Sequence, residues 1–374
     1  MAKLGDICTI NMGQSPESSS YNTIGEGLPF FQGNADFGDI HPTIRTWCSN
    51  PIKIAKKGDL LISVRAPIGA LNIANNQCCI GRGLAALTNY TKNIYKDYLW
   101  FALLSKINEL NSKGTGSTFK AINKKILAET DISLPSLEKQ KQIAKQLSCL
   151  NTLLLKRKQQ LSKLDQLVKS RFIEMFGEII KNDRNWPTFQ LSEIADSRLG
   201  KMLDSKQQTG TSSFYYLANF NVQWFSIDTS KLNKMDFDIK DQLEFQLHDG
   251  DVLVCEGGEI GRCAVWHNQI SPCFFQKALH RIRCKKNFIL PDYLTWWFKF
   301  NSENKAFENI AGAKATIAHL PGVKLKKLLI ATPPIHLQEE FASFVQQVDK
   351  VKSSVKQSLE TLETLKKSLM QKYF

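Results

Sequence analysis

Residues 137–176 read LEKQKQIAKQLSCLNTLLLKRKQQLSKLDQLVKSRFIEMF, and this stretch holds neither proline nor glycine. Along it one set of positions recurs at alternating steps of four and three: Ile143, Leu147, Leu150, Leu154, Arg157, Leu161, Leu164, Val168, Arg171 and Met175. That 3.5-residue period, apolar at all but two positions, predicts a long helix of the coiled-coil type. At a rise of 1.5 Å per residue, a helix of 40 residues is about 60 Å long.

A second stretch with the same period lies at the end of the chain, in residues 335–374. Its repeating positions are Phe341, Val345, Val348, Lys352, Val355, Leu359, Leu362, Lys366, Leu369 and Tyr373. The two stretches align without a gap at an offset of 198 (335 − 137), and each cationic position in one is apolar or aromatic in the other. One amphipathic helix cannot bury its stripe alone. We therefore expect the two helices to pair, with antiparallel pairing favoured because a two-fold arrangement uses one interface twice. The alternative is one long core helix in each domain.

The self-similarity extends outward from the helices through the whole chain. The matching landmarks are Leu4 to Gly13 with Leu191 to Gly200 (offset 187), Gly58-Asp59 with Gly250-Asp251 (192), Asp97-Tyr98-Leu99 with Asp292-Tyr293-Leu294 (195), and Gly114, Thr118 and Pro135 with Gly312, Thr316 and Pro333 (198). Because the offset grows and never reverses, the pattern indicates a duplicated module with small insertions in its loops.

This duplication predicts an α+β protein with two α/β globular domains and a helical segment after each. The expected bounds are residues 1–134 and 181–332 for the globular domains and 135–180 and 333–374 for the helices. Hydrophobic runs at 57–64 and 248–255 predict buried strands, and runs at 130–134 and 328–332 predict strands that end at prolines. Residues 95–107 and 291–300 predict short helices. Segments rich in glycine, asparagine or serine, at 32–34, 114–117, 257–258 and 311–313, predict loops.

The charge balance of the chain indicates a polyanionic partner. Its 374 residues include 49 Lys and Arg against 35 Asp and Glu, a formal net charge of +14. Cationic side chains on phosphates release counterions, so nucleic acid is the natural partner, although a generally basic surface would look similar. The sequence has no run of about 18 apolar residues, so we expect no membrane span. Its first residues also lack the apolar core of a signal peptide. We therefore expect a cytoplasmic protein whose nine cysteines, none in a C-x-x-C pair, are reduced and bind no zinc.

Sequence motifs for enzyme chemistry are incomplete. Residues 114–118, Gly-Thr-Gly-Ser-Thr, lack the spacing of a P-loop, and residues 332–335, Thr-Pro-Pro-Ile, lack the polar first and aromatic last residues of the amino-methyltransferase motif. Asp292, Glu303 and Lys305 resemble the Pro-Asp…Glu-x-Lys pattern of Mg²⁺-dependent nucleases. The matching positions of the first copy hold Asp97, Asn108 and Leu110, so a nuclease remains only as an alternative hypothesis.

Taken together, the repeated motifs resemble those of type I restriction-modification specificity subunits, over essentially the whole chain. Four paired segments carry the resemblance: the module openings (4–13 and 191–200), the Gly-Asp strands (58–64 and 250–255), the Gly…Thr segments (114–122 and 312–320), and the helix entries, LPSLEKQ at 134–140 and PPIHLQE at 333–339. No single motif decides, but all four occur in the same order twice.

The resemblance implies a non-catalytic, DNA-reading role. Each globular domain would be a target-recognition domain, the helices an antiparallel spacer, and the DNA target an asymmetric bipartite site with a fixed non-specific gap. Two modification subunits would supply the S-adenosylmethionine-dependent methylation, and restriction subunits the ATP- and Mg²⁺-dependent translocation and cleavage. This chain itself would hold no cofactor, no metal and no catalytic residue. The competing hypothesis is a coiled-coil adaptor that only scaffolds other proteins.

Polar and basic residues in the loops are the candidates for contacts with double-stranded DNA. In the first module they are Gln32, Asn34, Arg65, Arg82 and Lys120, and in the second they are Asn219, Arg262, Lys277, Arg281 and Lys314. Amide side chains suit adenine, and arginine suits guanine or a phosphate. The alternative for each is a surface polar residue or a local cap, and packing against glycine-rich turns could explain Arg65 and Arg82.

Overall fold

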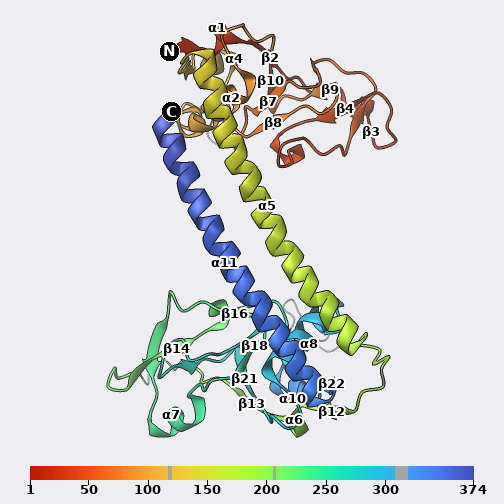
Figure 1. Cartoon of the computed structure of the whole chain (residues 1–374), viewed down its shortest axis with the longest axis vertical. Coiled ribbons are helices and arrows are strands. Elements are labelled where there is room, and N and C mark those ends of the chain that lie inside the picture. The colour runs from red at the N-terminus through yellow and green to blue at the C-terminus, as the bar shows by residue number, and fades with distance from the viewer. Residues whose placement is uncertain (117–119, 205–207, 308–318) are drawn as a thin grey trace. The chain divides into compact units, whose positions relative to one another are not determined.

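The computed structural model describes residues 1–116, 120–204, 208–307 and 319–374 (Figure 1). It is a mixed α/β protein with two compact units. Unit 1 comprises Met1–Lys158 with Gln357–Phe374, and unit 2 comprises Gln159–Lys356. Lys314, one of the candidate DNA contacts, lies outside the described residues, as do Thr118, Gly312 and Thr316 of the repeat.

Unit 1 is built on a four-stranded antiparallel sheet in the order β2-β10-β7-β8. Its strands are β2 (Thr9–Met12), β10 (Leu84–Thr88), β7 (Leu60–Ser63) and β8 (Leu71–Ile73). A five-stranded sheet in the order β3-β5-β4-β9-β6 contains β3 (Tyr21–Asn22), β5 (Trp47–Cys48), β4 (Leu28–Phe31), β9 (Cys78–Ile80) and β6 (Ile54–Ala55). The remaining elements are the pair β1 (Ala2–Lys3) and β11 (Asp131–Ile132), the helices α1 (Leu4–Ile7), α2 (Lys96–Ser105), α3 (Ile107–Ser112) and α4 (Lys124–Ala128), and the 3-10 turns η1 (Ser18–Ser20) and η2 (Asn34–Asp36).

Unit 2 has a four-stranded sheet of the same design, in the order β13-β21-β18-β19. These strands are β13 (Ala195–Leu199), β21 (Leu279–Cys284), β18 (Val252–Cys255) and β19 (Cys263–Val265). Three smaller groups accompany it: β17 (Asn233–Asp236) with β14 (Ser213–Leu217) and β20 (Phe274–Phe275), β15 (Val222–Gln223) with β16 (Ser226–Ile227), and β12 (Thr188–Gln190) with β22 (Leu329–Ala331). The other elements are α6 (Leu191–Ile194), α7 (Ile239–Phe245), α8 (Pro291–Glu303), α10 (Gly322–Lys326) and η4 (Asn219–Asn221).

The predicted strands and short helices are confirmed as elements. The runs at 57–64 and 248–255 contain β7 and β18, each the third strand in the order of its four-stranded sheet, and every residue of both strands is buried. The runs before the prolines form β11 and β22, and the predicted short helices are α2 and α8. Strand β4 pairs in parallel with β9 as β14 does with β20, so corresponding loops of the two units begin at corresponding strand ends.

Two long helices, α5 (Leu137–Phe176) and α11 (Ile335–Tyr373), occupy the stretches with the 3.5-residue period. Every one of the twenty repeating positions is buried or half-buried. In unit 1 the Tyr373 hydroxyl donates to Gln146 Oε1 at 2.7 Å, and Phe374 packs on Tyr98. In unit 2 Lys352 pairs with Asp165 at 2.7 Å and Arg171 with Glu340 at 2.6 Å. The segments of α5 and α11 inside unit 2 therefore run in opposite directions.

A fully buried glutamine ties the start of each long helix to its sheet domain. In unit 1 Gln140 accepts from Tyr95 N and donates to the carbonyl oxygens of Asn93 and Pro135, each at 2.9 Å. In unit 2 Gln338 accepts from Leu290 N at 2.9 Å and donates to Phe288 O at 3.0 Å and Pro333 O at 2.7 Å. Each glutamine has an exposed fraction of 0%. The glutamine five residues after a proline is thus the residue of both helix-entry motifs that fixes the helix to its sheet domain.

His280 gives unit 2 a predicted sensitivity to acid. Its side chain is 1% exposed, Nε2 lies 3.2 Å from Leu320 O, and burial lowers the pKa of the imidazole below its ordinary value. Below about pH 6.5 the unfolded chain binds a proton here that the folded chain does not, so stability falls as the pH falls. Between about pH 7 and pH 5.5 this group should cost up to about 1 kcal/mol in the free energy of unfolding.

The substitution His280→Gln should remove this pH-dependent loss of stability, because a carboxamide can still donate to Leu320 O but does not titrate. Denaturant unfolding of both proteins at the two pH values measures the difference. An equal loss of stability in the wild type and the variant would show that His280 does not carry the acid sensitivity.

Candidate nucleic-acid interface

A hollow of about 360 Å³ in unit 1 lies where three strand ends meet. Its walls come from the loop after β4 (Gln32 to Asp36), from Arg65 and Ala66 after β7, and from Arg82 and Gly83 between β9 and β10. Figure 1 shows these strands at one side of unit 1. Four of the five candidates predicted for this module, Gln32, Asn34, Arg65 and Arg82, line the hollow.

Lys120, the fifth candidate, lies beside the hollow because its backbone pairs with the segment that holds Arg65 and Ala66. Its carbonyl oxygen accepts from Ala66 N at 3.0 Å, and the next residue, Ala121, bridges to Arg65. The Lys120 side chain is exposed. The structure therefore gathers all five candidates of unit 1 at one place, although they are spread over almost ninety residues of sequence.

Glycines allow the two loops of this hollow to approach each other. Gly83 N donates to Gln32 O at 3.1 Å, and Gly81 N donates to Phe31 O at 2.8 Å. A Cβ atom on Gly83 would lie 2.5 Å from Gln32 O, closer than real Cβ contacts. Asp36 completes the loop, since its Oδ2 accepts from Gln32 N at 2.8 Å. The positions of Gln32 and Arg82 thus depend on the absence of a side chain at residue 83.

We predict that Gly83→Val weakens DNA binding without unfolding the protein. The added side chain must displace the carbonyl oxygen of Gln32, because a backbone atom cannot rotate away as a side chain can. The hollow then loses its shape. A decrease of at least about 10-fold in affinity corresponds to about 1.4 kcal/mol. Thr91→Val is the control, because it places the same side chain at an exposed residue of unit 1 that does not line the hollow. Equal DNA affinities for the two variants would contradict the role given to Gly83.

The electrostatics of the hollow suit a polyanion. The side chains of Gln32, Arg65 and Arg82 are exposed, and Asn34 is half-buried. Within the described ranges, neither Arg65 nor Arg82 forms an ion pair with a carboxylate. Asp36, the one acidic residue that lines the hollow, is held by backbone donors. Two unneutralised guanidinium groups beside amide side chains can bind phosphates and read base edges.

In unit 2, the corresponding loop holds Asn219 against Arg262. Asn219 O accepts from Arg262 Nη2 at 3.1 Å, and Asn219 Nδ2 donates to Gly257 O at 3.3 Å. Asn219 Oδ1 and Arg262 Nε are buried and have no hydrogen-bond partner among the described residues. Lys277 is exposed in the turn between β20 and β21, where its N donates to Lys201 O at 2.8 Å. Lys277 follows β20 as Arg82 follows β9.

Arg281 is placed differently from the other candidates. It lies within β21, opposite Arg198 and Leu253, and its Nη1 donates to Glu244 O at 3.0 Å. Its guanidinium lies 5.8 Å from the ring centre of Phe275, and desolvation by burial lowers its pKa. These contacts give Arg281 a structural role against α7, away from the turn that holds Lys277.

Two residues of the loops were missed by the sequence reasoning. Asp36 and Asn221 cap the 3-10 turns η2 and η4, and the Asn221 side chain also donates to the carbonyl oxygens of Asp228 and Lys231. Asx residues three positions into a short turn are the signal that could have found them. Phe220, in η4 beside Asn219, is 55% exposed and offers an aromatic face at the same loop.

The carboxylates that a nuclease would require are not brought together. Asp292 and Glu303 lie near opposite ends of the single helix α8, 11 residues and therefore about 16 Å apart along its axis. Glu303 pairs instead with Lys169 at 2.6 Å and Lys299 at 3.3 Å. In the part of the chain that the structure describes, no group of three His, Cys, Asp or Glu side chains could hold a metal ion. The described helices likewise include none with the length and apolar character to cross a membrane.

Three comparisons place the chain among known proteins. A Methanocaldococcus jannaschii protein described as the MjaX specificity subunit of a type I restriction enzyme is 46% identical over 151 residues, which are 40% of this chain and 36% of that protein. The type I restriction enzyme EcoBI specificity subunit of Escherichia coli is 20% identical over 99% of this chain and 84% of its own length. The crystal structure of a type I restriction-modification system S subunit from M. genitalium has the same fold, with a TM-score of 0.64 and 15% identity over 100% of this chain and 95% of that one.

A family model matches the chain twice. The type I restriction modification DNA specificity domain covers residues 1–165 and again residues 183–364. Each match contains one of the four-stranded sheets and the loops that follow its strands. The chain therefore belongs to the type I restriction modification DNA specificity domain family.

Proposed function

We propose that this chain is the DNA sequence-specificity subunit of a type I restriction-modification complex. The observation that carries the proposal is the hollow of unit 1, where Gln32, Asn34, Arg65 and Arg82 meet at exposed strand ends in a member of this family. Phosphate contacts from arginine and lysine would fix the register on the duplex, and amides and arginine would read base edges. The net charge of +14 supports a polyanionic partner.

Each unit would read one half of a bipartite target. The same strand order in the four-stranded sheets of the two units, with different residues at corresponding loops, supports an internal duplication whose copies recognise different sequences. Asn34 follows β4 and Asn219 follows β14, the strands that pair in parallel with β9 and β20, but Arg82 corresponds to Lys277 and Arg65 to Gly257. Two different readers imply an asymmetric target. The proposed target-recognition domains are residues 1–134 and 181–332.

The two long helices, within residues 135–180 and 333–374, would form an antiparallel coiled coil that sets the distance between the half-sites. The opposed contacts of α5 and α11 in unit 2 and the contact of Tyr373 with Gln146 in unit 1 support this pairing. Half-site spacing on DNA follows the spacing of the domains that read it. A pseudo-two-fold axis relating the two modules is part of this proposal.

Other subunits would carry out the chemistry. We propose two modification subunits that use S-adenosylmethionine and restriction subunits that use ATP and Mg²⁺, all in the cytoplasm, with this chain positioning them and catalysing no reaction. The failure of Asp292 and Glu303 to meet removes the structural basis for a nuclease in this chain.

Titration of DNA at several salt concentrations tests the proposal. The isolated chain should bind duplex DNA weakly, and the logarithm of its affinity should fall with the logarithm of salt concentration by about 0.9 for each phosphate contacted. Addition of a modification subunit should convert this into sequence-specific binding. An affinity that does not depend on salt would reject the DNA-reading role and favour the adaptor.

A further inference from the structure

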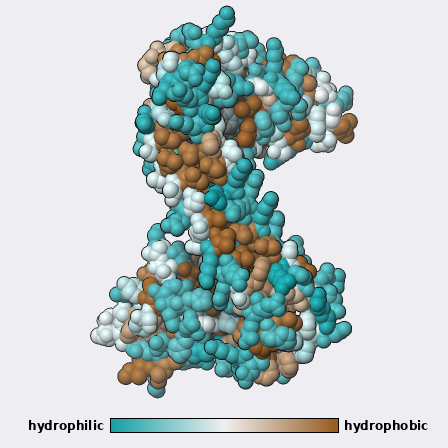
Figure 2. All heavy atoms as spheres, in the orientation of Figure 1, coloured by the Kyte–Doolittle hydropathy of each residue, from teal (hydrophilic) through white to brown (hydrophobic). Residues whose placement is uncertain are grey.

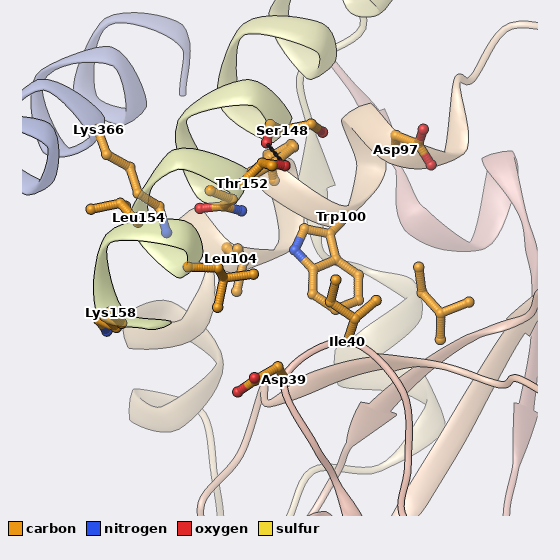
Figure 3. A pocket seen from close by; sticks show the side chains of 14 residues that line it. Asp39, Ile40, Asp97, Trp100, Leu104, Ser148, Thr152, Leu154, Lys158 and Lys366 are labelled. Carbon is orange, nitrogen blue, oxygen red and sulfur yellow. Dashed lines mark hydrogen bonds between the residues drawn. The ribbon is translucent and has the colours of Figure 1, made fainter. Parts of the chain in front are cut away.

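Exposed apolar side chains occur in separate patches on a largely hydrophilic surface (Figure 2). Such residues are common in folded proteins, so exposure alone does not indicate a binding site. The hollow of about 390 Å³ beside α2 selects neither cations nor anions, because its charged residues are two acidic and two basic (Figure 3): Asp39, Asp97, Lys158 and Lys366. Phe220 of unit 2 is different, because the turn that carries it corresponds to one wall of the candidate DNA-binding hollow of unit 1.

The turn with Phe220 is built in the same way as the turn beside that hollow. Both are 3-10 turns that come after a strand with a parallel partner, η2 after β4 and η4 after β14. In both, the side chain of the third residue, Asp36 or Asn221, accepts from a backbone N–H at the start of the turn, at 2.8 and 2.9 Å. Phe220 therefore corresponds to Ala35, the second residue of η2, which lines the hollow of unit 1. At the matching place, unit 2 carries an aromatic ring.

The Phe220 side chain is exposed although the backbone around it is firmly held. Phe220 is 55% exposed, and its carbonyl oxygen accepts from Gln223 Nε2 at 3.0 Å. The next residue, Asn221, is 1% exposed and donates to the carbonyl oxygens of Asp228 and Lys231, each at 2.9 Å. An exposed ring on a fixed backbone loses little conformational freedom when it binds a partner. The turn thus presents the ring in a form that is suited to recognition.

The polar side chains beside the ring are already bound within the protein. Arg262 Nη2 donates to Asn219 O at 3.1 Å, and Asn219 Nδ2 donates to Gly257 O at 3.3 Å. Glu259 Oε2 lies 3.9 Å from Arg262 Nη1 and offsets the charge of the guanidinium. The atoms left without a partner among the described residues, Asn219 Oδ1 and Arg262 Nε, are buried and cannot reach a base edge. What this turn offers to a partner is therefore mainly the Phe220 ring.

An exposed lysine lies beside the same turn. Gln276 N donates to Leu217 O at 3.0 Å, so the segment that holds Lys277 packs against the end of β14, two residues before η4 begins. Lys277 is exposed and follows β20 as Arg82 follows β9 in unit 1. A cation beside an apolar ring matches the major groove of DNA, where phosphates flank the apolar methyl groups of thymine.

We propose that the Phe220 ring contacts the C5-methyl group of a thymine in the half-site read by unit 2 and selects thymine at that position. The contact rests on the DNA-reading function proposed above. The methyl group is the apolar group that base pairs expose in the major groove, and a ring can pack on it while the bases stay stacked. Insertion of the ring between base pairs would require part of the stack to open. Unit 2 would read this position by apolar contact, whereas Ala35 at the matching place of unit 1 leaves room for a base edge that forms hydrogen bonds.

Replacement of each thymine of the target DNA in turn by deoxyuridine tests this proposal. Deoxyuridine pairs as thymine does but lacks the C5-methyl group, so only the apolar contact is lost. The target is the one found by mapping methylated adenines, and the protein is the complex of the full chain with its modification subunit. At one position the affinity of the wild type should fall about 4-fold, the effect expected for one buried methyl group. The Phe220→Ala variant should bind thymine and deoxyuridine equally at that position, and its affinity for the unmodified target should be at least about 5-fold lower than that of the wild type.

Phe288→Ala is the matched control. Phe288 is 40% exposed and belongs to the same unit, but it follows the end of β21, whereas Lys277 precedes the beginning of that strand. Its removal should leave both the affinity for DNA and the discrimination against deoxyuridine as in the wild type. The melting temperature of Phe220→Ala should also stay near that of the wild type, because an exposed ring contributes little to packing. Weaker binding by that variant would then not reflect unfolding.

The outcomes separate this contact from the DNA-reading function itself. A wild type that binds thymine and deoxyuridine equally at every position would overturn the contact, and so would a Phe220→Ala variant that keeps the full difference. Weaker association of Phe220→Ala with the modification subunit, at unchanged DNA specificity, would assign the ring to a protein partner instead. In each of these cases salt-dependent binding of DNA remains. DNA binding that does not depend on salt would reject the DNA-reading function and the contact together.

Discussion

Replacing Arg65→Ala and Arg82→Ala together is expected to weaken binding of target DNA at least about 30-fold. Both guanidinium groups are exposed in one hollow, and neither pairs with a carboxylate of the described residues, so their charge is available to DNA. A lost contact to a base is worth about 1–3 kcal/mol, and a total of about 2 kcal/mol already corresponds to a 30-fold change. If both arginines contact phosphates instead, the dependence of the logarithm of affinity on the logarithm of salt concentration should fall by about two.

Lys124→Ala with Lys125→Ala is the matched control for this pair. It removes the same two positive charges from unit 1, but from the exposed face of α4, which does not line the hollow. Gel-shift or anisotropy titration of the complex with its modification subunit measures both variants. Equal losses of affinity in the two double variants would mean that net charge, and not the hollow, accounts for binding.

Gln338→Ala is expected to lower the free energy of unfolding by about 3–5 kcal/mol. The side chain makes three hydrogen bonds in a fully buried place, and its removal leaves Leu290 N and the carbonyl oxygens of Phe288 and Pro333 without partners. Each buried polar group left unpaired costs about 1–3 kcal/mol. The start of α11 should also lose its fixed position relative to α8, because the glutamine joins the two helices.

Gln347→Ala, an exposed glutamine of the same helix, is the control and should change the free energy of unfolding by less than about 0.5 kcal/mol. Gln140→Ala should behave as Gln338→Ala does, because Gln140 makes the same three kinds of contact in unit 1. Denaturant unfolding followed by tryptophan fluorescence measures all three. A loss below about 1 kcal/mol for Gln338→Ala would show that water or a shifted backbone replaces the glutamine.

The long helices could be predicted from the sequence because their signals are local. Residues 137–176 contain no helix breaker, and a proline lies two residues before the helix begins, so period and boundaries agree. The buried strands β7 and β18 were found for the same reason, since each is a short hydrophobic run after Gly-Asp. The order of strands in the sheets was not predicted, because pairing partners such as β4 and β9 are almost fifty residues apart and their choice depends on the tertiary fold.

The candidate site was only partly predictable. The sequence predicted that Gln32, Arg65 and Arg82 lie in loops, and each of them follows a strand, but their contact with DNA stays a prediction. Arg281 differs from them, because no local feature of the sequence indicated that it lies inside β21 with its side chain donating to Glu244 O. The role of Gly83 was equally hidden, since it depends on the approach of Gln32 from a distant segment.

Mapping of methylated adenines in the host genome, with and without this gene, tests the central claim most directly. The account predicts that the gene specifies a single asymmetric motif with two defined parts and a gap of fixed length between them. It predicts further that substitution of Gln32 and Asn34 alters the recognised bases of one part and leaves the other part and the gap unchanged. A continuous motif, or a methylation pattern that is the same in the absence of the gene, would contradict two readers held at a set distance.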